Sequence, residues 1–287
     1  MITETFKGNM TCLEPLHHGS NEDYGTTKLI LRLDTVIKNE SGEKGIDKVP
    51  AIHGNAIRGK LRRLMMQEYL DLLDYQLDSM KVYHFLFTGG MLEAGSSADK
   101  GAIDLKLKQR LRELIPPISL LGSALGNQMI QGKLKVGLGN LVCKETADYI
   151  SDEYDTSFGA YNLKASDFGT RLDDLKESKP ANDDDKKEKE QSTQMMYEFE
   201  TIIRGAMFTH EFVLEDANPV EKACFVNAVN LLKERPYLGG KGATGYGKMK
   251  FDYPTLEGAT DTAYRDYVND NKEEMIKLLD ELVGTWK

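Results

Sequence analysis

The chain has 287 residues, 40% of them hydrophobic, which is enough for one large globular domain with a substantial core. It contains no run of about 18 apolar residues, so the sequence predicts no membrane span, and its start lacks the features of a signal peptide. The 3 cysteines lie far apart, which excludes a disulfide framework and the close spacing of a zinc site. We therefore expect a cytoplasmic protein with reduced thiols.

The net charge of −9 is unevenly distributed along the chain. Residues 145–200 contain 16 acidic and 7 basic side chains, and residues 255–287 contain 8 acidic and 4 basic ones. The rest of the chain is therefore slightly basic, with a net charge of +4. Because phosphate binding needs local positive charge, the acidic total does not exclude a nucleic-acid partner.

The first half of the chain predicts strands followed by a strong helix. Strands are expected at 1–16 and 28–38, the second because apolar and polar residues alternate in it. Polar loops are expected at 17–25 and 39–48. A helix is expected from Asn55, which can cap it, to about residue 72.

The second half mixes helices, strands and an acidic insertion. A helix at 105–114 is expected to stop at two prolines, and the glycines of 118–142 predict loops around a short strand. The charge run at 182–190 is typical of a solvated loop. The remaining expected elements are strands at 195–203, 207–214 and 249–253, a helix from Asn218-Pro219 to about 233, and a C-terminal helix at 271–284.

This order of elements predicts an α+β fold. We expect a single ferredoxin-like (RRM-like) domain over 1–287, with an antiparallel sheet, helices and large insertions. The largest insertion, at 144–200, is acidic.

A glycine-rich loop at 239–248 is the most distinctive motif. It contains a GxGxxG pattern and also resembles a phosphate loop, except that Met249 stands where Ser or Thr would hold magnesium. Both nucleotide sites need a strand before the loop and a helix after it, and the predicted order here is reversed. Two interpretations of the loop stay open. It is either a tight connection whose glycines prevent clashes, or an anion-binding loop that uses Lys241, Lys248 and the aromatic face of Tyr246.

A second motif is the basic start of the first helix. Residues 56–63 contain four basic and no acidic side chains, and Arg58 and Arg62 share one helical face, flanked by Lys60 and Arg63. The free amides of a helix start can bind phosphate. The alternative is an ordinary amphipathic surface helix with solvated arginines.

Five blocks in this order resemble the RAMP superfamily of CRISPR-associated RNA-binding proteins. The glycine loop is similar to its C-terminal signature, and residues 49–63 are similar to the signature in which a turn opens the first helix. This chain departs from the latter at His53 and at Asn55-Ala56. The other blocks are Leu-His-His-Gly at 16–19, Pro-Ile-Ser-Leu-Leu-Gly-Ser-Ala-Leu-Gly-Asn at 117–127, and residues 170–174 with 194–200, which look like type IV and related backbone subunits.

The resemblance implies a subunit that binds guide RNA (crRNA) as copies of itself stack head to tail along the guide. Its other implied partners are further CRISPR effector subunits and the complementary target RNA or DNA. A thumb-like β-hairpin would lie in the acidic insertion, and no cofactor or metal is implied apart from Mg²⁺ in a nuclease-active form. The expected RNA-binding residues are His18, Gly19, His53, Gly54, Asn55, Arg58, Lys60, Arg62, Arg63, Gly240, Lys241, Gly242, Thr244, Tyr246 and Lys248.

Two enzymatic alternatives stay open. Type III-like backbone subunits cleave target RNA, and the resemblance then makes Asp34 the catalytic residue, although Glu22 and Asp23 have an equal chemical claim. A guide-processing RAMP endoribonuclease is less in keeping with the chain, because such enzymes usually contain two ferredoxin-like halves and the sequence indicates one. Asp34 lies in a predicted continuous strand rather than in a free loop, which favours a non-catalytic role.

We predict that the assembled complex, incubated with Mg²⁺ and complementary RNA, leaves that RNA intact. The Asp34→Ala variant should behave in the same way, as gel analysis of the RNA will show. Cuts at regular spacing that disappear in Asp34→Ala would instead make the chain a metal-dependent endoribonuclease.

Overall fold

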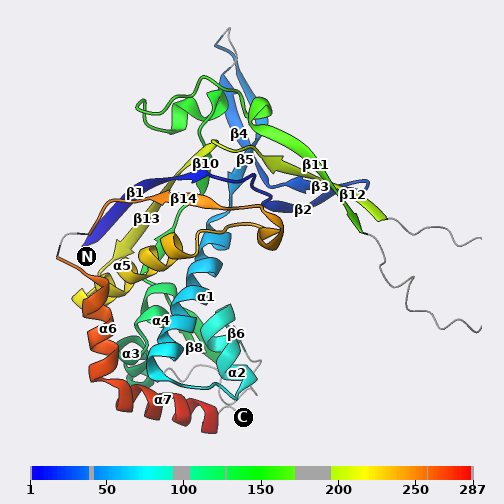
Figure 1. Ribbon diagram of the computed structural model, residues 1–287. Helices are drawn as coiled ribbons and strands as arrows, with labels where there is room; N and C mark the ends of the chain where they lie inside the picture. The colour runs from blue at the N-terminus through cyan, green and yellow to red at the C-terminus, as the bar shows by residue number, and fades with distance from the viewer. Residues whose placement is uncertain are drawn as a thin grey trace, which may run out of the picture.

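The computed structural model describes residues 2–38, 42–92, 104–126, 128–171, 195–256 and 258–285. A sheet crosses the molecule, most of the helices gather below one of its faces, and two β-hairpins project beyond it (Figure 1). None of the helices in these ranges has the length and hydropathy needed to cross a bilayer.

The main sheet has seven strands in the order β14-β1-β13-β10-β5-β4, with β9 paired to β13 off this path. Its neighbouring strands run antiparallel. Along the chain, β1, α1, β10, β13, α5 and β14 follow the βαββαβ order of the ferredoxin-like motif. The predicted α+β class with an antiparallel sheet is therefore confirmed. These elements span Thr3–Cys12 (β1), Arg32–Lys38 (β4), Lys44–Ile52 (β5), Gly54–Leu73 (α1), Leu134–Val136 (β9), Gly139–Leu141 (β10), Met207–Glu215 (β13), Pro219–Glu234 (α5) and Met249–Asp252 (β14).

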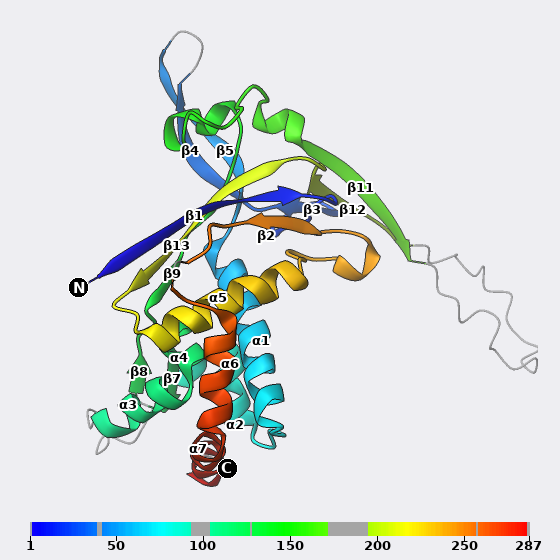
Figure 2. The ribbon, with the colours of Figure 1, turned by 60° about the vertical axis from the view of Figure 1, so that its left-hand side comes forward.

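The core lies between this sheet and the two helices α1 and α5 (Figure 2). Alternate residues of the strands face the helices, among them Met10, Phe208 and Phe212, which are fully buried. Ile57 and Leu61 of α1 are also fully buried, as their helical spacing predicts. Burial of these side chains is the main term that holds the helices to the sheet.

The start of α5 lies where the sequence predicts it, and its cap also makes tertiary contacts. Asn218 and Glu221 exchange hydrogen bonds of 2.8 Å between side chain and backbone, forming a capping box. The Glu221 carboxylate is buried and also accepts hydrogen bonds from Ser119 Oγ at 2.5 Å and Lys133 Nζ at 2.7 Å. A local helix-start signal thus ties α5 to the segment between α1 and β10.

That segment is a largely helical insertion below α5 (Figure 1). Its α3 has the predicted bounds and ends before the two prolines, as expected. The prolines also begin the next helix, α4, which the sequence did not indicate. The loops expected at 118–142 also contain short strands, because glycines here allow close strand approaches that a loop pattern does not reveal. The elements are α2 (Met80–Tyr83), the π-helical turn η1 (His84–Thr88), β6 (Gly90–Leu92), α3 (Leu105–Leu114), α4 (Pro116–Leu121), β7 (Ser123–Gly126) and β8 (Gln128–Ile130).

Two helices follow β14, the first packed mainly on α5 and α1 and the second on α1, α2 and α3. The last, α7 (Lys272–Thr285), lies where a C-terminal helix was expected and buries Met275, Leu278 and Leu279. The helix before it, α6 (Asp261–Asp270), was missed by the sequence interpretation because only Tyr264 and Val268 of its side chains are buried.

A second sheet contains four strands in the order β11-β12-β3-β2. Its strands are β2 (Gly19–Tyr24), β3 (Thr27–Ile30), β11 (Lys164–Arg171) and β12 (Met195–Ile202). The antiparallel pair β11–β12 projects away from the main sheet in both views (Figures 1 and 2). This hairpin belongs to the acidic insertion, which also holds the short 3-10 turns η2 (Lys144–Tyr149) and η3 (Ala160–Leu163). The charge run at 182–190 lies outside the described residues.

The predictions for residues 17–48 are partly wrong. The loops expected at 17–25 and 39–48 contain β2 and the first half of β5, and the single strand expected at 28–38 is divided at Leu31 into β3 and β4. Because β2 and the first half of β5 expose nearly all their side chains, they lack the apolar alternation by which strands are recognised.

Candidate nucleic-acid interface

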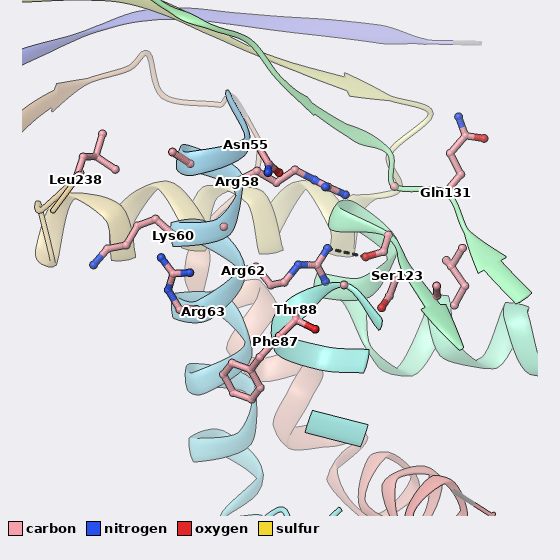
Figure 3. A pocket seen from close by; sticks show the side chains of 18 of the residues that line it. Asn55, Arg58, Lys60, Arg62, Arg63, Phe87, Thr88, Ser123, Gln131 and Leu238 are labelled. Carbon is pink, nitrogen blue, oxygen red and sulfur yellow. Dashed lines mark hydrogen bonds between the residues drawn. The ribbon is translucent and has the colours of Figure 1, made fainter. Parts of the chain in front are cut away.

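A groove of about 1010 Å³ opens beside the start of α1 (Figure 3). Its walls are the first turns of α1, the end of η1, the strands β7 and β8 with the residues up to Gly132, and residues 237–240 at the entry to the glycine loop. The two motifs that the sequence singled out therefore meet in one groove, although they are far apart in the chain.

The start of α1 is fixed against the sheet. His53, rather than the predicted Asn55, is the N-cap, because its Nδ1 accepts the backbone N–H of Asn55 at 3.2 Å and the helix begins at Gly54. A Cβ at Gly54 would lie 2.5 Å from the carbonyl oxygens of Val136 and Gly137. Only glycine allows this close approach, which leaves Asn55 at the groove.

Three cations of α1 line the groove and are at least partly exposed. Lys60 and Arg63 extend from one side of the helix and Arg58 from the other (Figure 3). Burial, and then the positive charges of Arg63 and Arg235, lower the pKa of Lys60. No Asp or Glu is among the described residues that line the groove, so its charge is positive throughout. A bound phosphate would relieve the repulsion between these cations.

Arg235 was missed by the sequence interpretation. It is exposed and follows the last residue of α5, Glu234, four residues before the glycine loop. Its position next to that motif is the signal that could have identified it.

Arg62 does not join the exposed cations, contrary to the prediction. Its side chain is buried and donates hydrogen bonds to the carbonyl oxygens of Leu86 at 3.3 Å, Leu121 at 3.0 Å and Gly122 at 2.7 Å. Burial and then the charge of Arg58 lower the pKa of Arg62 to about 10, so the guanidinium stays charged at neutral pH. Arg62 therefore lines the groove as a buried structural residue whose N–H groups are hydrogen-bonded to carbonyls.

The glycine loop is hydrogen-bonded to the residues that precede β2. Gly240 N donates to His17 O at 2.9 Å and Gly247 N donates to Pro15 O at 2.8 Å. A Cβ at Gly239, where φ is +72°, would lie 2.4 Å from the His17 carbonyl oxygen. Glycine is therefore required where the loop and the Leu-His-His-Gly block touch, so the prevention of clashes accounts for part of this motif.

Two predicted RNA contacts of the loop face the β11–β12 hairpin instead. Lys241 Nζ lies 3.9 Å from the ring centroid of Phe199 and 4.3 Å from that of Tyr197, which is cation–π geometry. Tyr246 donates its hydroxyl to Asp167, and this hydrogen bond, with burial, raises the pKa of Tyr246 to about 12. The loop thus braces the base of the hairpin.

The predicted RNA-binding residues are consequently divided between two places. The left-handed turn at Lys241 (φ 63°) directs the following residues away from the groove. Seven of the predicted residues line it: His18, Asn55, Arg58, Lys60, Arg62, Arg63 and Gly240. The other eight do not: Gly19, His53, Gly54, Lys241, Gly242, Thr244, Tyr246 and Lys248.

The two adjacent histidines have different partners. His18 Nε2 accepts the backbone N–H of His53 at 3.2 Å, and burial, His53 and His17 lower its pKa. The Nδ1 atom of His17 lies 2.7 Å from the carbonyl oxygen of Glu200 in β12. Within the described ranges, no three His, Cys, Asp or Glu side chains gather in a way that could hold a metal ion.

Asp34 is exposed in β4, in register with Lys48 of β5, and is not a lining residue of the groove. The other two acids considered as catalytic, Glu22 and Asp23, are exposed residues of β2. Asp23 is paired with Lys28, and Glu22 lies 3.9 Å from Lys48 Nζ.

A ferredoxin-like domain with a cationic groove is a fold and site typical of RNA-binding proteins. A sequence profile of the RAMP superfamily matches residues 9–250. The chain therefore belongs to the RAMP superfamily, as the five sequence blocks predict.

The fold is also found in a solved CRISPR structure. A chain of the structure titled "Type IV-B CRISPR Complex" superposes with a TM-score of 0.60 at 19% sequence identity, over 93% of this chain and 98% of that chain. No curated protein sequence matches significantly.

We predict that Arg62→Met lowers the free energy of unfolding by about 2–4 kcal/mol, because the buried carbonyl oxygens of Leu86, Leu121 and Gly122 each lose a donor and only that of Leu121 keeps Arg58. The matched variant Arg63→Met, at the next and exposed position, should change it by less than about 0.5 kcal/mol. Urea denaturation followed by circular dichroism measures both. Equal effects at the two positions would contradict the structural role of Arg62.

Proposed function

We propose that the chain is a guide-RNA-binding backbone subunit of a CRISPR ribonucleoprotein effector complex. The observation that carries this proposal is the groove, in which partly exposed cations from α1 face the entry to the glycine loop and no described lining residue is acidic. Membership of the RAMP superfamily and the similarity to a chain of a type IV-B CRISPR complex support the same assignment.

The groove suits recognition of the sugar-phosphate backbone. Arg58, Lys60 and Arg63 supply charge without a carboxylate partner among the described residues, and Asn55 adds a polar side chain at the helix start. Contacts to phosphate carry no sequence information. A subunit that holds guides of any sequence needs this kind of recognition.

The β11–β12 hairpin is the candidate for the thumb that interrupts base pairing between guide and target. It projects from the molecule, and Lys241 and Tyr246 brace its base from the glycine loop. We propose that this bracing fixes the hairpin relative to the groove, so that a guide held in the groove meets the hairpin at a constant place.

In this function the partners are crRNA, complementary target RNA or DNA, other effector subunits and further copies of the chain arranged head to tail. The alternative function, a subunit that cleaves target RNA, depends on Asp34. The cleavage experiment with Asp34→Ala distinguishes it from a subunit that only binds RNA. The alternative of a processing endoribonuclease would normally bring a second ferredoxin-like half, and the described residues form one βαββαβ unit.

Replacing Arg58, Lys60 and Arg63 together by Ala should weaken binding of single-stranded guide RNA by at least about tenfold at physiological salt. Each lost phosphate contact on a single strand reduces the slope of log K against log salt by about 0.7, so the slope should become shallower by about 2. Fluorescence anisotropy over a series of salt concentrations measures both quantities.

The matched control replaces three exposed lysines outside the groove, Lys7, Lys144 and Lys250, by Ala. It changes the net charge by the same amount and should leave the slope unchanged. If both triple variants lose affinity equally, binding depends on overall charge and the groove is not the RNA site.

Self-association is tested by size-exclusion chromatography with and without guide RNA. We expect large species, with several copies per guide, only when RNA is present, because the guide bridges the subunits. A monomer that releases discrete RNA products would instead support the processing endoribonuclease.

A further inference from the structure

The far wall of the groove is a π-helical turn, η1, which belongs to the helical insertion. The N–H of Gly89 closes the turn onto the carbonyl of His84, and Thr88 Oγ donates to the same oxygen at 2.9 Å. Such wider turns are frequent at functional sites. Here the turn buries Phe85 and Leu86 in the core and leaves Phe87 and Thr88 at the groove.

Phe87 is partly exposed and packs in part against the core. Tyr83, one turn earlier, stacks on its ring with centroids 4.9 Å apart and planes inclined by 18°. Arg62 fixes the turn from the other side through the Leu86 carbonyl. The Phe87 side chain reaches from η1 toward α1, below Arg63 in the view (Figure 3).

The two walls of the groove therefore differ in chemical character. The α1 wall carries the cations Arg58, Lys60 and Arg63, whereas the opposite wall presents Phe87 and the exposed side chain of Met129 beside the polar Thr88 and Gln131. A nucleotide has the same division, with an anionic phosphate and a base whose faces stack on aromatic rings.

We propose that Phe87 is a base-stacking residue, on which an unpaired base of single-stranded RNA lies while its phosphates contact Lys60 and Arg63. This inference rests on the proposed function and adds that the groove recognises bases as well as backbone, without selecting their identity. Stacking tolerates any base because every base has a π face. A double helix would not fit this role, because its bases are already stacked on one another.

An apolar protein segment is the other occupant that an aromatic wall could accept. RNA is favoured because the ring shares its groove with three cations that form no salt bridge among the described residues, and because no described lining residue is acidic. A groove for an apolar peptide would gain nothing from those charges.

The test compares wild type with Phe87→Leu, which keeps an apolar side chain and removes the ring. Two RNA probes are used: a short single-stranded oligouridylate with one 2-aminopurine, and an abasic chain of the same length. Loss of stacking should weaken binding of the first probe by about 5- to 150-fold and restore 2-aminopurine fluorescence. Binding of the abasic probe should not change, and Phe87→Tyr should restore wild-type behaviour.

Phe158→Leu is the control, because Phe158 is exposed and outside the groove. Thermal melting establishes that all variants are folded. If Phe87→Leu weakens both probes equally, or neither, the stacking assignment is wrong, while the proposed function still stands if the triple variant of Arg58, Lys60 and Arg63 loses affinity. If that triple variant binds RNA normally, the proposed function itself fails. Capture of an apolar peptide that Phe87→Leu abolishes, without an effect on RNA, would also overturn the inference.

Discussion

The buried guanidinium of Arg62 is the interaction on which the groove depends. It extends from the middle of a core helix and donates to carbonyls in two separate parts of the helical insertion, at Leu86 and at Leu121 and Gly122. A buried charge needs such a complete set of acceptors to be tolerated. Arg62 thus joins the main domain to its insertion, together with the contacts of Glu221 to Ser119 and Lys133, and the space above Arg62 is the groove.

Parts of this architecture could be predicted because they are encoded locally. The cap and proline at Asn218-Pro219, and the apolar stripe around Ile57 and Leu61, mark elements whose type does not depend on distant residues. The α+β class follows from the order of such elements. The exposed strand β2 and the exposed first half of β5 could not be predicted, because strand pairing rather than apolar alternation stabilises them.

The sequence predicted the two motifs that line the candidate site, but only some of the residues that form it. Helical spacing places Arg58 and Arg62 on one face, but it cannot tell that one turn of the helix separates a partly exposed cation from a buried one. Both donate to the carbonyl of Leu121, and Arg62 also donates to those of Leu86 and Gly122, which the spacing does not reveal. Phe87 belongs to no motif, and only tertiary structure brings it to the groove, whereas the place of Arg235 just before the glycine loop was a signal available in the sequence.

The absence of a side chain at Gly54 has a consequence for the thermodynamics of binding. Because the helix start rests directly on the carbonyls of Val136 and Gly137, α1 has no room to move closer to them when a ligand binds. A groove wall that is fixed in this way loses little conformational entropy on binding. In the proposed function the ordering cost would fall mainly on the RNA, and a strand already held in an extended shape by a neighbouring copy would bind at a lower entropic cost.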